Sequence, residues 1–310
     1  MYPSENEPCE NLAEFLTAIA GLRVRWRKLK LPTQSDKTRP YGEERALWFR
    51  GQRDAGWGLS PKIWRAEYCD ANEAEMRLEF ESVGHPFARS GLTVDKWHWY
   101  FLMQHYRAPT RLLDWTVNPL VALYFALCED RECNAAVWVV DPWRWNSAHV
   151  KDLFGPAVAG WRETTDYLLD LEDAFDTDIN QKQTKEKWPV AIEPSHIDQR
   201  IAAQGSKFVL FGRERDMVKS PTINRPRGGG GKYAILDRIL ISNEVVARLR
   251  AELNQIGINE RAMFPDLEGL GRHIAWEWKT RTAIPGETKA ARRVRFLRNP
   301  KVPTKGTKER

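Results

Sequence analysis

The sequence lacks most of the features that identify membrane, secreted or metal-binding proteins. No apolar run approaches the ~20 residues that a membrane-spanning helix needs, so we expect no membrane segment. The first ten residues are polar and acidic and do not resemble a secretory signal. The four cysteines are scattered, and no second Cys or His pair near Cys128 and Cys133 completes a zinc site. We therefore expect reduced thiols, no bound metal and a cytoplasmic location.

Common catalytic motifs are absent as well. The six histidines form no HExxH pattern, no serine lies in a nucleophile elbow, and no cysteine has an evident base partner. Four consecutive glycines, Gly228–Gly231, lack the Lys-Ser/Thr ending and the following helix of a phosphate-binding P-loop. These absences argue against metal-dependent hydrolysis and against a nucleophilic triad.

The composition is that of a soluble globular protein with an unevenly distributed charge. The 310 residues are 42% hydrophobic and 29% charged, with a net charge of +6. Residues 279–310 contain eleven Lys or Arg against two Glu, a local +9, which leaves −3 for the rest of the chain. We predict that this basic tail is disordered. It is suited either to contact a nucleic-acid backbone or to act as a solvated extension.

Hydrophobic periodicity alternates between helix and strand, which predicts an α+β fold with a mixed or antiparallel sheet and helical decoration. We expect a helical and basic segment at residues 1–45, a main domain at 46–278 with an insertion at 143–187, and the tail at 279–310. In the first segment Asn11 and Glu14 form a capping box, and Gly21 is expected to end the helix.

The stretch Gln104–Ala126, QHYRAPTRLLDWTVNPLVALYFA, places many polar groups inside apolar sequence. Such groups must either be paired with one another or be exposed in a cleft. Residues 110–116 are expected to be extended, with Thr110, Leu112, Asp114 and Thr116 on one face. Asn118 and Pro119 are typical of a helix N-cap and first helical residue, so a buried helix should follow.

Arg50 lies near the end of a predicted buried strand at residues 46–52. An arginine beside Gly51, which would let a ligand approach the backbone, is well placed to bind an anion. An arginine paired with a buried carboxylate fits the spacing equally well. We expect a polar cleft that suits a nucleotide-like ligand. Its expected members are Arg50, Gln104, His105, Tyr106, Thr110, Arg111, Asp114 and Asn118.

Several of these segments resemble the FRG domain family of bacteria and phages, named for its Phe-Arg-Gly motif. The resemblance rests on Trp48-Phe49-Arg50-Gly51-Gln52, Gln104-His105-Tyr106, residues 109–116 (PTRLLDWT) and Asn118-Pro119-Leu120. Arg200, Gln204-Gly205 and residues 264–270 (FPDLEGL) resemble later blocks, so the resemblance spans about residues 47–270. The family has no well-defined activity, so this resemblance does not specify the chemistry.

The chain also resembles, less closely, ADP-ribosyltransferases of the Arg-Ser-Glu type. These carry an aromatic-Arg-Gly on the first core strand, where the arginine holds NAD, and a Ser/Thr strand and a catalytic Glu follow. The resemblance implies NAD as a consumed substrate and a catalytic set of Arg50, His105, Thr110 (with Thr116 as its alternative), Glu193 and Glu268. No Glu-x-Glu or Gln-x-Glu lies on a late strand, so Glu193 and Glu268 are candidates only. The implied NAD-binding residues are Arg50, Gly51, Gln104, Tyr106, Arg111, Asp114, Asn118 and Gln204.

Three functions are consistent with the sequence. The first is an NAD-dependent ADP-ribosyltransferase that acts as a toxin or anti-phage effector, with RNA, including mRNA, or DNA as acceptor and an antitoxin as partner. The second is a nucleic-acid-binding or nuclease module, for which the basic tail argues. The third is a non-catalytic partner-binding domain in which the polar residues of the central stretch form a structural network.

Overall fold

The computed structural model describes residues 7–27, 46–68, 73–87, 96–128, 132–149, 153, 155–159, 188–194, 199–212, 214–219 and 235–281. The chain divides into two compact units, Met1–Asn259 and Glu260–Arg310. The predictions for Gly228–Gly231, for most of the insertion and for the tail from residue 282 onward lie outside the described residues. In the part of the chain that is described, no helix has the length and apolarity needed to cross a membrane.

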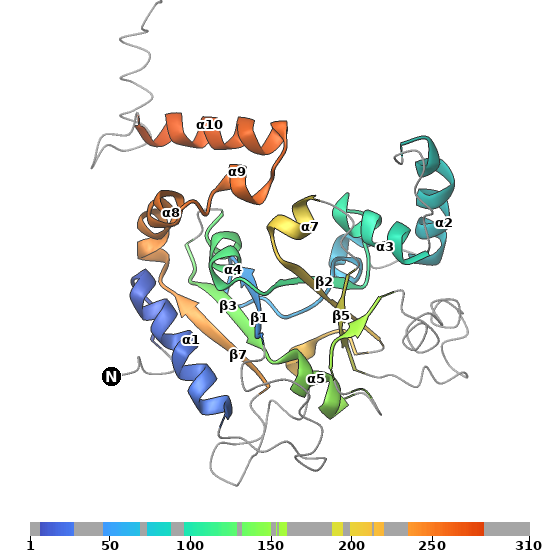
Figure 1. Ribbon diagram of the computed structural model, residues 1–310, viewed down its shortest axis with the longest axis horizontal. Helices are drawn as coiled ribbons and strands as arrows, with labels where there is room; N and C mark the ends of the chain where they lie inside the picture. Colours follow the sequence, from blue (N-terminus) through green and yellow to red (C-terminus); the bar gives the residue numbers. More distant parts are fainter. Residues whose placement is uncertain are drawn as a thin grey trace, which may run out of the picture. The chain divides into compact units, whose positions relative to one another are not determined.

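The first unit is built on a mixed β-sheet whose described strands number seven, in the order β4-β5-β6-β2-β1-β3-β7 (Figure 1). Strands β4 and β5 are parallel, and the other neighbouring strands are antiparallel. The predicted α+β fold with a mixed sheet is therefore confirmed. The strands are β1 (Trp48–Gln52), β2 (Leu112–Thr116), β3 (Ala135–Val140), β4 (Ala157–Val158), β5 (Val190–Glu193), β6 (Ser206–Leu210) and β7 (Leu236–Ile241).

Helices surround this sheet, and a further pair forms the described part of the second unit. The helices of the first unit are α1 (Leu12–Arg27), α2 (Glu73–Gly84), α3 (Lys96–His105), α4 (Pro119–Ala126), α5 (Pro142–His149), α7 (Gln199–Ala203) and α8 (Val246–Gln255). Short 3-10 helices are η2 (Lys62–Trp64), η3 (Ala66–Tyr68), η4 (His85–Phe87), η5 (Met217–Lys219) and η6 (Asn243–Val245). The second unit contains α9 (Glu260–Met263) and α10 (Leu267–Arg281).

The strand register separates the side chains of the sheet into two faces. Residues directly opposite one another on paired strands share a face, and successive residues alternate between faces. Asp114 is opposite Phe208 and Leu113 is opposite Val209. We call the side that carries Leu112, Asp114, Thr116 and Phe208 the Leu112 face, and the other side the Trp115 face. The alternation predicted for β2 is confirmed, because Leu112 and Trp115 belong to different hydrophobic clusters.

Different helices cover the two faces. Aromatic residues of α3 pack against the Leu112 face, where the rings of Phe101 and Phe208 lie 5.1 Å apart. On the Trp115 face, the fully buried Trp145 of α5 packs in the same cluster as Trp115. The Asn146 side chain of α5 bonds the backbone N–H and carbonyl of Ala191 on β5, at 2.8 and 2.9 Å. The sheet is thus a middle layer between helical and loop segments.

Helix α4 packs unusually close to β1, and Gly51 makes this approach possible. A Cβ at Gly51 would lie 1.9 Å from the carbonyl oxygen of Ala122 and 2.6 Å from the backbone nitrogen of Ala126. The sequence predicted that this glycine would let a ligand approach the backbone. That prediction is wrong, because the space beside its Cα is filled by the backbone of α4.

The predicted caps are confirmed, but one predicted helix end is wrong. Asn118 accepts a hydrogen bond from the backbone N–H of Leu120 at 2.9 Å, and Pro119 opens α4. Helix α1 continues through Gly21 to Arg27, although we expected the glycine to end it. Leu22 and Trp26, both buried, extend the apolar stripe of α1, and this helix lies against β7 (Figure 1). Burial of that stripe outweighs the modest cost of one helical glycine.

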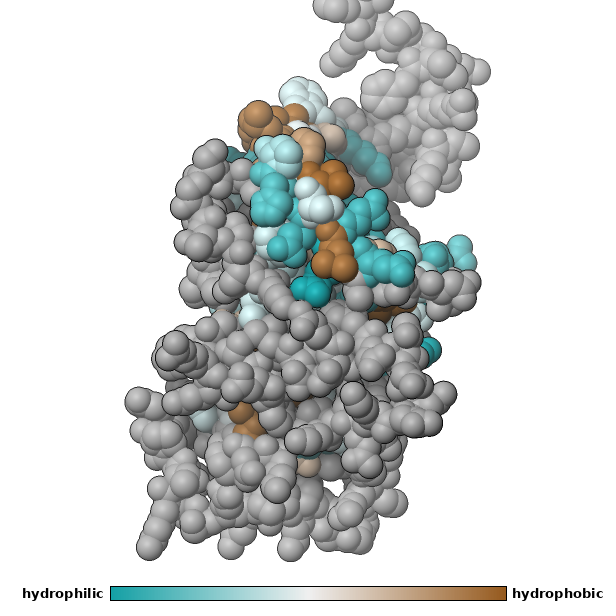
Figure 2. Space-filling view, turned by 90° about the vertical axis from the view of Figure 1, so that its right-hand side faces the viewer, coloured by the Kyte–Doolittle hydropathy of each residue, from teal (hydrophilic) through white to brown (hydrophobic). Residues whose placement is uncertain are grey.

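One side of the first unit displays α2 and η4, which carry the exposed hydrophobic residues Leu78, Val83 and Phe87. Figure 2 shows this side, where hydrophobic residues lie as separate spots among hydrophilic ones. Scattered apolar residues of this kind are normal on protein surfaces and do not indicate a docking surface.

We expect Gly51→Ala to lower the free energy of unfolding by about 3 kcal/mol or more, because α4 must shift away from β1. Urea unfolding followed by circular dichroism measures this loss. Gly271→Ala in α10 is the control, since nothing lies within 4 Å of its added Cβ. This control should keep or slightly raise stability. An unchanged unfolding midpoint for Gly51→Ala would contradict the close packing of α4 on β1.

Candidate functional site

Asp114 is exposed in the middle of the sheet. Strand β2 is fourth of the seven strands, and Asp114 is its central residue, yet its side chain is 59% exposed. The other four residues of β2 are buried. A central strand covered on both faces normally carries buried apolar side chains. The cover of the Leu112 face is therefore interrupted above Asp114.

Two helices limit the exposed area around Asp114. Phe208, directly opposite Asp114 on β6, is buried against Phe101 of α3. On the other side, Gly51 of β1 shares the Leu112 face and is covered by α4. Solvent therefore reaches the sheet between α3 and α4, at the point where β2 carries a carboxylate.

Arg50 reaches this point from the neighbouring strand. It is paired with Trp138 and starts on the Trp115 face, but its Nη1 donates a hydrogen bond to the backbone carbonyl of Asp114 at 2.7 Å. The described parts of β1 and β2 share one register pair, Phe49 with Thr116. Because the strands separate beyond this pair, the guanidinium of Arg50 serves as donor to the Asp114 carbonyl in place of a strand N–H group.

The positive charge of Arg50 is only partly compensated. Its side chain is 15% exposed, and the carboxylate of Asp114 lies 3.9 Å from Nη1, a loose ion pair. Burial lowers the pKa of Arg50 to about 10, although the Asp114 carboxylate raises it in part, and the nearby charge of Arg65 lowers it further. Nε has no hydrogen-bond partner among the described residues. Arg50 remains charged at neutral pH, so an anionic ligand would complete its electrostatic environment.

Gln104 fixes the orientation of the Asp114 carboxylate. Its Nε2 donates to both carboxylate oxygens, at 2.9 Å each. Its Oε1 accepts a hydrogen bond from the Thr110 hydroxyl, and that hydroxyl accepts from the backbone N–H of Leu112 at 3.2 Å. Because the hydroxyl donates to Oε1, the amide nitrogen must face Asp114. Helix α3 and strand β2 thus hold the carboxylate in a defined position.

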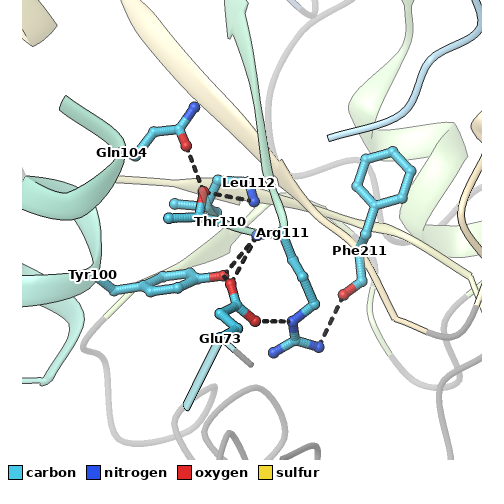
Figure 3. A network of polar contacts seen from close by, with 7 residues as sticks. All are labelled: Glu73, Tyr100, Gln104, Thr110, Arg111, Leu112 and Phe211. Carbon is cyan, nitrogen blue, oxygen red and sulfur yellow. Dashed lines mark hydrogen bonds and ion pairs between the residues drawn. The ribbon is translucent and has the colours of Figure 1, made fainter. Parts of the chain in front are cut away.

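A buried network lies next to this exposed cluster (Figure 3). Glu73 begins α2, and its carboxylate accepts hydrogen bonds from Nε and the backbone N–H of Arg111, at 2.7 and 2.8 Å, and from the Tyr100 hydroxyl. Nη1 of Arg111 donates to the carbonyl of Phe211 at 3.1 Å, and the N–H of Phe211 donates to the carbonyl of Arg111 at 3.1 Å. The network therefore joins α2, α3, the start of β2 and the end of β6.

The charges in this network balance one another. Burial and then the Glu73 carboxylate raise the pKa of Tyr100 well above its usual value, so its hydroxyl stays protonated. Burial acts to lower the pKa of Arg111, but Glu73 and Tyr100 outweigh this effect, and the pKa is raised. The sequence predicted that Arg111 binds a cofactor. Its contacts form a structural ion pair, in which its charge already has a buried partner, and its predicted contact with a ligand stays a prediction.

Thr116 and Asn118, which follow Asp114, form hydrogen bonds that stabilise the turn between β2 and α4. The Thr116 hydroxyl donates to the backbone carbonyl of Gln204 at 2.6 Å and accepts from the N–H of Asn118 at 3.0 Å. Asn118 uses its side-chain oxygen to cap α4. These contacts give Thr116 and Asn118 structural roles and bring the backbone of Gln204 beside them. The predicted ligand contacts of Asn118 and Gln204 stay predictions.

His105 ends α3, and Tyr106 is the first residue after the helix. Their rings meet edge to face with centroids 4.8 Å apart, and Tyr106 is 66% exposed. The exposed ring offers a surface on which a base could stack. The predicted catalytic role of His105 stays a prediction.

Each of the two glutamates that the sequence proposed as catalytic has a basic partner of its own. Glu193 forms an ion pair with Lys207 at 3.0 Å. Lys207 is opposite Trp115, so Glu193 lies on the Trp115 face, away from the Asp114 carboxylate. Glu268 belongs to the second unit, where Arg272 contacts it at 2.6 Å. Their predicted roles stay predictions.

Sequence reasoning missed Glu73, Tyr100 and Arg65 as parts of this region. Glu73 looks like any acidic residue in the first turn of a helix, and Tyr100 looks like a member of the apolar stripe of α3. Nothing in the sequence around Arg65 indicates that it lies near Arg50. Its effect on the pKa of Arg50 depends on how the fold brings together two residues that are 15 positions apart in the chain.

A comparison with protein-family models matches the FRG domain to residues 45–135. No curated protein and no solved structure matches the chain. The matched range contains Arg50, Glu73, Gln104, Arg111 and Asp114. The later segments that resembled the family lie outside this range. Within the part of the chain that the structure describes, no group of three or more His, Cys, Asp or Glu side chains could hold a metal ion.

We expect the two arginines to differ in their effect on stability. Arg111→Ala should lower the free energy of unfolding by about 3–5 kcal/mol, because it leaves the buried Glu73 carboxylate without its partner. Arg50→Ala should cost about 1–2 kcal/mol, since it removes one hydrogen bond to a backbone carbonyl. Urea unfolding measures both losses. Arg23→Ala on the exposed side of α1 is the control and should stay within about 0.5 kcal/mol of the unmodified protein. Equal losses for Arg50 and Arg111 would contradict this division of roles.

Proposed function

Because residues 45–135 of this chain form an FRG domain and contain the Arg50–Asp114 site, we propose that the protein binds NAD at this site and transfers its ADP-ribose to an acceptor. One observation carries the proposal. Arg50 is a nearly buried cation whose charge is incompletely matched, and it lies under the exposed part of the central strand. Such an arginine is suited to bind the phosphate groups of a nucleotide.

The contrast with Arg111 supports this assignment. Both arginines are largely buried, but Arg111 pairs with a carboxylate at 2.7 Å, whereas the carboxylate paired with Arg50 among the described residues lies 3.9 Å away. The charge of Arg65 adds to the positive potential near Arg50. The pyrophosphate of NAD carries two negative charges, so two guanidinium groups with one carboxylate nearby complement it.

The likeness of the Phe49-Arg50-Gly51 motif to ADP-ribosyltransferases supports NAD as the nucleotide. Arg50 lies on the first described strand of the sheet, as the resemblance implies for the arginine that holds NAD. In this proposal Arg50 and Arg65 hold the pyrophosphate, and the exposed ring of Tyr106 stacks on a base or on the nicotinamide. NAD is consumed as a substrate, and no metal takes part.

The biological role that we propose is that of a toxin or anti-phage effector, with nucleic acid as acceptor and an antitoxin as partner. The +9 charge of residues 279–310 supports RNA or DNA as the acceptor, because basic segments bind phosphate backbones. A second candidate is a partner-binding domain without chemistry. The balanced network of Glu73, Tyr100 and Arg111 favours it, since this part of the central motif needs no ligand.

We expect NAD to bind the intact protein and Arg50→Ala to weaken this binding at least tenfold. A charge-assisted hydrogen bond contributes about 1.5–3 kcal/mol, which corresponds to a tenfold or greater change in affinity. Isothermal titration calorimetry with NAD measures the dissociation constant. Transfer is measured with NAD labelled in its adenylate phosphate, incubated with RNA, DNA and protein.

Arg23→Ala serves as the matched control, because it removes an arginine from the exposed surface of α1. It should bind and transfer like the unmodified protein. Absence of NAD binding and of label transfer in the unmodified protein would reject the enzymatic proposal and favour a partner-binding domain.

A further inference from the structure

The Asp114 carboxylate has an unusual combination of fixed position and solvent access. Gln104 donates to both of its oxygens, and Nη1 of Arg50 lies 3.9 Å from one of them. Its side chain is nevertheless 59% exposed. In the described part of the chain it is the carboxylate that forms an ion pair with Arg50. A fixed carboxylate that a ligand can still reach is suited to interact with positive charge that develops during a reaction.

We propose that Asp114 is the catalytic carboxylate of this domain, which stabilises the positively charged ribosyl group as nicotinamide leaves. This inference rests on the proposed function, because it requires NAD at the Arg50 site. This role differs from the one predicted for Asp114 from the sequence, which was to bind NAD. It also replaces Glu193 and Glu268 as the source of the catalytic negative charge.

The strand register favours Asp114 over Glu193. Asp114 lies opposite Phe208, and Phe208 lies opposite Ile192, so these three residues share the Leu112 face. Glu193 follows Ile192 and projects from the other face, where Lys207 neutralises it at 3.0 Å. A ligand that contacts the Asp114 carboxylate on the Leu112 face is therefore separated from Glu193 by the sheet itself.

Glu268 is less suited for a different reason. Arg272 contacts its carboxylate at 2.6 Å, so this carboxylate already has a cation as partner within α10. The cation beside Asp114 is Arg50, which in our proposal also binds the phosphate groups of NAD. When the phosphate groups bind Arg50, the negative charge of Asp114 becomes available to the ribosyl group.

Gln104 and Thr110 act as positioning residues in this arrangement. The Thr110 hydroxyl holds the Gln104 amide in one orientation, and the amide holds the carboxylate. Thr110 is fully buried, so this support is shielded from solvent. Preorganised groups of this kind stabilise a transition state without having to rearrange during the reaction.

The reaction step conserves atoms and charge. The bond between the anomeric carbon of the ribose and the ring nitrogen of nicotinamide breaks, and its electron pair leaves with nicotinamide, which becomes neutral. The ribosyl group becomes a positively charged oxocarbenium ion beside the Asp114 carboxylate. A hydroxyl or amine of the acceptor, or water, then bonds to the anomeric carbon and releases one proton to solvent.

Variants of the full chain that remove a charge but keep the size of the side chain test this role. We expect Asp114→Asn to reduce the single-turnover rate of nicotinamide release at least 100-fold, while the dissociation constant of NAD changes less than about threefold. Arg50→Ala should show the opposite pattern, with its main effect on NAD affinity. Glu193→Gln should keep the rate within about threefold of the unmodified protein. Gln104→Ala should lower the rate about tenfold with little change in NAD affinity, because it loosens the carboxylate without removing its charge.

Asp114→Glu and Asp114→Gln form a second pair, which has equal side-chain length and differs only in charge. Thermal unfolding establishes that each variant is folded. Within this pair, the Glu variant should release nicotinamide at least tenfold faster than the Gln variant. Equal rates within the pair, or full activity of Asp114→Asn, would overturn the inference while leaving the proposed function intact. Failure of the unmodified protein to bind or cleave NAD would reject the proposed function itself. A large loss of rate in Glu193→Gln with a normal rate in Asp114→Asn would return the catalytic role to Glu193.

Discussion

The buried ion pair between Glu73 and Arg111 is the interaction on which the arrangement of this domain depends. It joins the first residue of α2 to the residue before β2, and the hydroxyl of Tyr100 brings α3 into the same contact. Two backbone and side-chain bonds then connect Arg111 to Phe211 at the end of β6. Removing two charges from water costs several kcal/mol for each ion, which only good geometry and further hydrogen bonds offset. These segments must therefore come together as a group. If one partner is missing, a charge is buried without the contacts that offset its desolvation.

The position of the candidate site follows from this network. Tyr100 and Gln104 are four residues apart on α3, so they lie on the same side of the helix, one turn from each other. Arg111 and Asp114 are close neighbours at the start and the middle of the same strand segment. When Tyr100 and Arg111 are fixed by Glu73, Gln104 is brought within 2.9 Å of Asp114. The buried network thus gives rigidity, and the exposed cluster next to it gives access to a ligand.

The two arginines show how charge compensation separates a structural role from a binding role. Arg111 has a carboxylate at 2.7 Å and a raised pKa, whereas Arg50 has a looser partner and a pKa lowered to about 10. Arg50 is the central residue of β1 and Arg111 immediately precedes β2, and both have apolar neighbours in the sequence. Arg50 is the better candidate to bind a ligand, because an incompletely compensated cation gains most from an anionic partner.

The sequence by itself determined the α+β class, most of the strands and helices, and the cap that starts α4 at Asn118, because these depend on residues a few positions apart. It also brought Arg50, Gln104, Thr110 and Asp114 into one predicted group, and the structure places these four together. Only the tertiary structure decided that α1 continues past Gly21 and that Gly51 lets the backbone of α4 pack close to β1. It also decided that Glu73 neutralises the charge of Arg111. It also decided, through strand register, that Glu193 and Asp114 lie on opposite faces of the sheet. The physical reason is that the burial and charge compensation of a side chain depend on groups within a few ångströms, and those groups come from distant parts of the chain.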